Sequence, residues 1–121
     1  MSFDRLRVRV LLAGLLATGC GDLALEDVAP ESIPALPTYA VHIQPIVSHY
    51  CVPCHSETTR PGKRGEESDQ NYTTYEGTVA GYHGIETNVL KKDKMPPGAA
   101  RRVTSWEKAV LVRWSKVGYP P

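Results

Sequence analysis

The stretch Cys51-Val52-Pro53-Cys54-His55 decides how this chain folds. Two cysteines separated by two residues and followed directly by a histidine form a C-x-x-C-H pattern, which is typical of covalent haem attachment. The spacing has a chemical reason, because thiols three positions apart lie on one turn and can each add to one vinyl group of a porphyrin. The imidazole that follows then lies under the iron as the proximal ligand. We therefore expect one covalent haem c per chain, attached through Cys51 and Cys54, with His55 on the iron.

Three other interpretations of this stretch are open. A redox dithiol is expected within a thioredoxin-like βαβ pattern, which the flanking sequence lacks. A structural zinc site needs two further ligands at matching spacing, and the other histidines form no second ligand pair. A plain disulfide between the two cysteines leaves the adjacent histidine without a role. Haem attachment is the hypothesis that uses all three residues.

The N-terminal stretch has the pattern of an export signal. Three arginines, at positions 5, 7 and 9, precede an apolar run over residues 10–17. That run is shorter than the roughly 20 apolar residues of a membrane span, but it suits a secretory signal peptide. It ends in Ala17-Thr18-Gly19-Cys20, which looks like a bacterial lipobox. We expect a signal peptide over residues 1–19, a lipid anchor on Cys20 and a location on the periplasmic side of the cell envelope; the alternative is a signal peptide without lipidation.

The composition indicates one small domain behind this leader. The 121 residues carry 14 Lys and Arg against 13 Asp and Glu, a net charge of +1, which argues against an electrostatic nucleic-acid binder. Residues 20–37 are acidic and contain prolines, as expected of a tether, and residues 38–121 are expected to form the domain. Its large aliphatic side chains are few, so an apolar cofactor in the middle of the molecule would complete the core.

From Tyr39 to Tyr119 the chain resembles the class I, cytochrome-c-like family. The resemblance rests on a helix leading into the C-x-x-C-H motif, a Met-Pro-Pro-Gly segment at residues 95–98 and a closing helix with tryptophan. It implies an all-α fold, a small helical bundle around one haem in which the first and last helices cross. Members of the family often carry a Gly-Pro whose carbonyl accepts from the proximal imidazole. Here the order is Pro61-Gly62, so the acceptor for the ring N–H of His55 stays open.

Met95 is the expected sixth ligand of the iron. Met1 is lost with the signal peptide, so Met95 is the one thioether of the mature chain. It lies far enough after His55 for the chain to wrap round the haem, and the two prolines that follow it favour a stiff extended strap. Ligation by His and Met leaves no open site for a substrate. The alternative sixth ligands are the remaining histidines, first His83, then His42 and His49.

Apolar stripes and capping residues predict the helices. A first helix has a shared face of Ile43, Ile46, Val47 and Tyr50, with Pro45 in its first turn. A turn over residues 39–43 is expected to precede it. A short helix is expected from about residue 72 to residue 80, followed by a second stripe of Ile85, Val89 and Leu90. The last helix begins at a capping box, Thr104 to Glu107, and ends at Gly118. Its expected inner side is Trp106, Val110, Trp114 and Val117.

These features predict a one-electron carrier rather than an enzyme. The alternative is a haem-based enzyme or sensor with a labile sixth ligand that admits peroxide or a gas, and a third possibility is a haem-free lipoprotein. We expect a monomer that meets redox protein partners and is held at a membrane through Cys20. Basic residues flank Met95 and would steer an acidic partner, or else form an ordinary solvated face: Lys91, Lys92, Lys94, Arg101 and Arg102.

Overall fold

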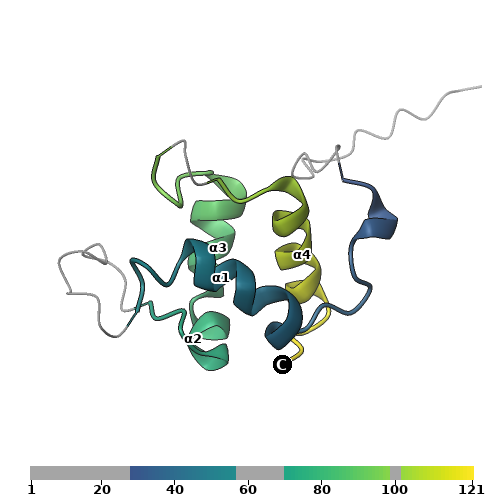
Figure 1. Ribbon diagram of the computed structural model, residues 1–121, viewed down its shortest axis with the longest axis horizontal. Helices are drawn as coiled ribbons and strands as arrows, with labels where there is room; N and C mark the ends of the chain where they lie inside the picture. The colour runs from purple at the N-terminus through teal and green to yellow at the C-terminus, as the bar shows by residue number, and fades with distance from the viewer. Residues whose placement is uncertain (1–27, 57–69, 99–101) are drawn as a thin grey trace, which may run out of the picture.

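The computed structural model describes residues 28–56, 70–98 and 102–121, and these residues form helices and loops with no β-strand among them. The α-helices are α1 (Gln44–Tyr50), α2 (Tyr75–Ala80), α3 (Tyr82–Ile85) and α4 (Ser105–Lys116). Shorter turns are the 3-10 turn η1 (Pro30–Ser32) and the π-helical turns η2 (Tyr39–Ile43) and η4 (Glu86–Lys91). In Figure 1, α1 runs across the middle of the view, with α4 on one side and α2 and α3 on the other. The expected all-α class is confirmed for the described residues.

The first helical segment follows its sequence pattern. Pro45 lies in the first turn of α1, where its missing N–H leaves no bond unmade. The turn η2 precedes α1 and continues into it, as expected for residues 39–43. Ile43 and Val47 are completely buried, and Tyr50 at the end of α1 packs against the core from its edge. The predicted inner face is therefore confirmed. The C-x-x-C-H motif follows directly after the last residue of α1.

The short helix expected from about residue 72 to residue 80 is α2, which begins at Tyr75 and ends at Ala80. The Thr74 side chain accepts a hydrogen bond from the Gly77 N–H at 3.0 Å and so caps the start of α2. Thr78 is completely buried in the last turns of α2, and its hydroxyl donates to the Thr74 carbonyl at 2.8 Å. α3 then runs directly into η4. The predicted second stripe is buried as expected: Ile85, Val89 and Leu90.

The closing helix α4 has the predicted capping box. The Thr104 hydroxyl accepts from the Glu107 N–H at 3.2 Å, while the Glu107 carboxylate accepts from the Thr104 N–H at 2.8 Å. Beyond the other end, Gly118 has a φ of +87°, a left-handed conformation that glycine adopts without steric cost. The helix therefore starts and stops where its local sequence dictates.

The predicted inner face of α4 is wrong at Trp106. Trp106 is 39% exposed, and its indole N–H donates to the Ser32 carbonyl at 3.0 Å, whereas Trp114 on the same stripe is completely buried. The first turn of α4 extends past the core to the segment that contains η1. An indole suits such an edge, because its ring packs while its N–H finds a partner.

Trp114 is the centre of an aromatic core. Its ring lies 4.9 to 6.4 Å, centroid to centroid, from four tyrosine rings, those of Tyr39, Tyr75, Tyr82 and Tyr119. The Trp114 indole N–H donates to the Pro120 carbonyl at 2.8 Å, and the Tyr82 hydroxyl donates to the Leu111 carbonyl at 2.9 Å. Tyrosines thus supply apolar volume beside the aliphatic side chains. The hydroxyls of Tyr75 and Tyr82 donate to backbone carbonyls, whereas the buried Tyr39 hydroxyl has no hydrogen-bond partner among the described residues.

Residues 28–37, expected as the end of the tether, lie against the domain. Ile33 packs on the core from outside, and Pro37 is completely buried. The Tyr39 N–H donates to the Pro120 carbonyl at 2.9 Å, which joins the start of η2 to the C-terminus. The expected signal peptide and Cys20 lie outside the described residues. Among the described helices, none combines the length and the apolar character needed to cross a bilayer.

Candidate functional site

The C-x-x-C-H motif forms a tight turn directly after α1. The Cys51 N–H donates to the Val47 carbonyl at 2.8 Å, in continuation of the helix. The Cys51 carbonyl then accepts from two N–H groups, those of Cys54 at 3.1 Å and His55 at 2.8 Å. These hydrogen bonds close residues 51–55 into a single turn. Cys51, Cys54 and His55 therefore belong to one turn, as the spacing predicts.

The two cysteines of this turn are free thiols in different environments. Cys51 is half-buried and Cys54 is exposed. Burial raises the pKa of Cys51 to about 12, and the neighbouring Cys54 contributes in the same direction. At neutral pH the Cys51 side chain is therefore a protonated thiol. Reactive thiols of dithiol oxidoreductases have lowered pKa values, because the thiolate is their nucleophile.

His55 is half-buried and lies beside a tyrosine that the sequence does not single out. The ring centroids of His55 and Tyr72 are 5.5 Å apart, with an interplanar angle of 82°. The Tyr72 N–H also donates to the His55 carbonyl at 3.0 Å. Burial raises the pKa of the Tyr72 hydroxyl, and the nearby Cys51 adds to this shift. Pro61-Gly62, which was compared with the Gly-Pro of the family as an acceptor for the His55 ring N–H, lies outside the described residues.

Met95 lies on the loop after η4, and the residue is 40% exposed. Its N–H donates to the Asn88 carbonyl at 3.1 Å, and the Lys94 N–H donates to the same oxygen at 2.7 Å. Residues 95–98 form no helix, as expected, but they form consecutive bends instead of the expected extended strap, and the Met95–Pro96 bond is cis. The backbone on the N-terminal side of Met95 is therefore tied to η4.

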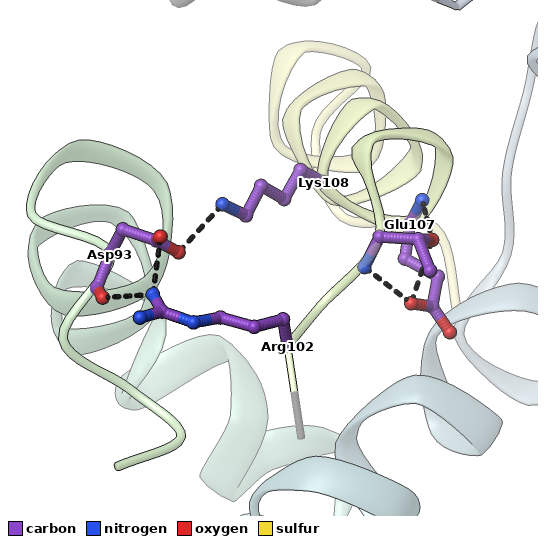
Figure 2. A network of polar contacts seen from close by, with 5 residues as sticks. Asp93, Arg102, Glu107 and Lys108 are labelled. Carbon is purple, nitrogen blue, oxygen red and sulfur yellow. Dashed lines mark hydrogen bonds and ion pairs between the residues drawn. The ribbon is translucent and has the colours of Figure 1, made fainter. Parts of the chain in front are cut away.

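An ionic cluster ties this loop to α4 (Figure 2). The Asp93 carboxylate pairs with the Lys108 ammonium of α4 at 2.8 Å and with the Arg102 guanidinium, which also donates to the Asp93 carbonyl at 2.8 Å. The hydrogen bond from Lys108 is the main cause of the lowered pKa of Asp93, and Arg102 lowers it further. Asp93 has a φ of +49°, a left-handed conformation that Asp adopts more readily than most residues.

The same cluster reduces the positive charge expected around Met95. Arg102 is paired with Asp93, and the Lys91 ammonium lies 3.1 Å from the Glu86 carboxylate. Arg101 lies outside the described residues. Of the basic residues predicted to flank the loop, only Lys92 and Lys94 have no ion pair within the described part of the chain. The basic face is thus smaller than the sequence alone indicates.

The other histidines occupy separate positions. His42 follows the start of η2, and its Nδ1 accepts from the Thr38 N–H at 3.1 Å. The His49 ring lies 4.6 Å from the Tyr50 ring, centroid to centroid, and His83 lies 3.9 Å from the Glu86 carboxylate. Across residues 28–56, 70–98 and 102–121, no three His, Cys, Asp or Glu side chains gather as a metal-binding group.

Cys51, Cys54, His55 and Met95 are the residue types that would hold a covalently attached haem, and they lie on two separate segments, the turn after α1 and the loop after η4. Two free thiols and an imidazole share one turn, and a partly exposed thioether lies on a loop anchored at its N-terminal side. Two thiols would form the two thioether links, and the imidazole and the methionine thioether would be the two protein ligands of the iron. In Figure 1 the turn after α1 and the loop after η4 lie on the left of the view, whereas α4 lies on the right.

Comparisons of the chain with protein-family models, with curated proteins and with solved structures found no match.

Proposed function

We propose that the protein is a one-electron carrier of the bacterial cell envelope with a cytochrome-c-like fold. One haem c is attached through Cys51 and Cys54, and the axial ligands are His55 and Met95. The observation that carries this proposal is the tight turn after α1, in which the Cys51 carbonyl accepts from the N–H groups of both Cys54 and His55. That turn presents all three attachment groups together, directly after a helix packed on the core.

A bound haem supplies a reversible one-electron couple between Fe(III) and Fe(II), and the protein supplies attachment and a constant ligand set. The two thiols hold the group covalently, so it does not dissociate outside the cytoplasm. His55 is positioned by the turn and by its contact with Tyr72. Met95 is positioned through the bond from its N–H to Asn88 and through the neighbouring Asp93 cluster. Ligands that stay in place keep the reorganisation during electron transfer small.

The environment of Cys51 does not suit this thiol to be the nucleophile of a redox dithiol. Burial raises its pKa to about 12, the reverse of what a nucleophilic thiol requires. Haem attachment does not require a low thiol pKa in the folded protein, because each thioether link to a haem vinyl group is formed once, before electron transfer begins. The half-buried thiol is instead a suitable place for an apolar group.

A second candidate function is a haem-based enzyme or sensor whose sixth ligand is labile. The exposure of Met95, which is 40% exposed, favours this alternative, because an exposed thioether is easily displaced by a small molecule. The two functions share the attachment turn and differ at the sixth ligand. The weak red absorption band of an iron–methionine bond distinguishes them: its presence in the oxidised protein supports the carrier, and a high-spin spectrum supports the alternative.

The proposed location follows from the expected lipid anchor on Cys20, and the proposed partner follows from the basic residues beside Met95. A lipid on Cys20 holds the domain, as a monomer, at a membrane surface on the periplasmic side. A redox protein partner with acidic groups would meet the exposed face that carries Lys92, Lys94 and Met95.

The attachment is tested by producing the full chain together with c-type maturation machinery and staining a denaturing gel for haem. We expect stain at the position of the parent protein and loss of stain in a Cys51→Ser, Cys54→Ser double variant. The matched control is Cys20→Ser, which removes the third cysteine and should keep the stain while losing the lipid by mass. His55→Ala should lose the native spectrum. A parent protein without stain would overturn the proposal.

A further inference from the structure

Tyr72 contacts His55 through both its ring and its backbone. The rings meet edge to face, with centroids 5.5 Å apart and an interplanar angle of 82°. The Tyr72 N–H donates to the His55 carbonyl at 3.0 Å. A ring contact and a backbone bond to one residue define both where its main chain lies and how its imidazole can turn.

Tyr72 is itself held firmly. Only 4% of it is exposed, and its hydroxyl lies 3.1 Å from the Gly81 carbonyl and 2.6 Å from the Gln70 amide oxygen. Gly81, between α2 and α3, has no side chain at a point where a Cβ would lie 2.8 Å from the Tyr72 ring. A larger residue there would therefore push the ring away. The junction of α2 and α3 thus sets the position of the Tyr72 ring.

We infer that Tyr72 is a positioning residue that sets the plane of the His55 imidazole on the iron. The inference rests on the proposed function. A histidine ligand rotates about the bond to its ring unless a neighbouring group fixes it, and such neighbours tune the metal they never touch. Here the neighbour is an aromatic ring, buried and pinned by the α2–α3 junction, on the side chain of Tyr72.

The test is electron paramagnetic resonance of the oxidised holoprotein, because the g values of a low-spin ferric haem depend on the orientation of its axial ligands. We expect Tyr72→Leu, which removes the ring, to shift the largest g value. Tyr72→Phe keeps the ring and loses the hydroxyl, and it should restore g values close to those of the parent. The matched control is Tyr82→Leu, which removes another buried tyrosine, bonded to the Leu111 carbonyl, and should leave the g values unchanged.

Gly81→Ala provides a second route if Tyr72→Leu does not accumulate, because its Cβ displaces the Tyr72 ring without removing it. A shifted g value in either variant, with an unchanged Tyr82→Leu control, supports the inference. Parent g values in both Tyr72→Leu and Gly81→Ala, or an equal shift in Tyr82→Leu, would overturn the inference alone. A parent protein without covalent haem would overturn the proposed function and the inference together.

Discussion

The hydroxyl of Tyr50, the last residue of α1, donates to the Glu107 carboxylate in the first turn of α4 at 3.0 Å. The same carboxylate oxygen accepts from the N–H and the hydroxyl of Thr104, each at 2.8 Å. One acidic side chain therefore completes the cap of α4 and joins that helix to α1. Since Tyr50 immediately precedes Cys51, this bond also fixes α4 relative to the proposed attachment turn.

Tyr50→Phe should lower the free energy of unfolding by about 1 kcal/mol, because it removes one hydrogen bond and keeps the ring. Thr104→Ala should cost a similar amount, about 1 kcal/mol, through loss of the helix cap. Urea unfolding measures both. In a Glu107→Ala background, Tyr50→Phe should have little further effect, since its acceptor is already gone. An undiminished effect in that background would show that the bond does not account for the loss.

Asp93→Asn should weaken the hold on the Met95 loop, because it removes the negative charge shared by Arg102 and Lys108 (Figure 2). In the oxidised holoprotein we expect severalfold faster displacement of Met95 by added imidazole, followed through loss of the red absorption band. High salt should accelerate displacement in the parent and less so in the variant, since the paired groups are exposed.

The matched control for Asp93 is Glu86→Gln, which breaks the ion pair with Lys91 on η4 and leaves the Asp93 cluster intact. Equal displacement rates for Asp93→Asn and the parent would contradict a positioning role for the cluster. Equal acceleration by the two variants would point to a general effect of charge.

The two tryptophans of α4 should differ strongly in their contribution to stability. Trp114→Ala should cost about 3–5 kcal/mol, because it leaves a cavity among four tyrosine rings. Trp106→Ala should cost about 1 kcal/mol, since its ring is partly exposed and it loses one bond, to the Ser32 carbonyl. Denaturant unfolding of both variants checks this, with Trp114→Phe as an intermediate that still folds. Equal losses would place both rings in the core.

Tyr82 should make the protein less stable at alkaline pH. Burial is the main cause that raises the pKa of its hydroxyl from 10 to about 12. Because the folded state holds the proton more tightly, the stabilisation is fully present below pH 10 and is lost as the pH rises toward 12. Tyr82→Phe keeps the ring and removes the titration. The unfolding free energy of Tyr82→Phe should therefore fall less than that of the parent over this interval, and the difference between the two proteins should be at most about 3 kcal/mol. Parallel curves for the two proteins would contradict the prediction.

Much of the helical framework was predictable because its signals are local. The Thr104–Glu107 box and Pro45 act on backbone groups within four positions along the chain. The apolar spacing before Cys51 likewise predicted which face of α1 is buried. The C-x-x-C-H turn belongs to the same class, because its hydrogen bonds join residues three and four positions apart.

It was less predictable which side chains fill the core. The large aliphatic side chains alone predicted too little apolar volume, whereas tyrosines around Trp114 supply part of it. Two of them, Tyr75 and Tyr82, donate their hydroxyls to backbone carbonyls. Trp106 had the right spacing for the core and still lies at its edge. Periodicity shows which side of a helix is apolar, but it does not show how far along the helix the core extends.

The sequence by itself determined the helices, their caps and the grouping of two thiols and an imidazole on one turn, because those features depend on neighbours along the chain. Only the tertiary structure decided that Tyr72 lies against His55, that Asp93 pairs with Arg102 and Lys108, and that Tyr50 meets Glu107. These contacts join separate segments of the chain, from Asp93 and Arg102, nine positions apart, to Tyr50 and Glu107, 57 positions apart. Such packing is set by the sum of many side-chain contacts, and no single motif encodes it.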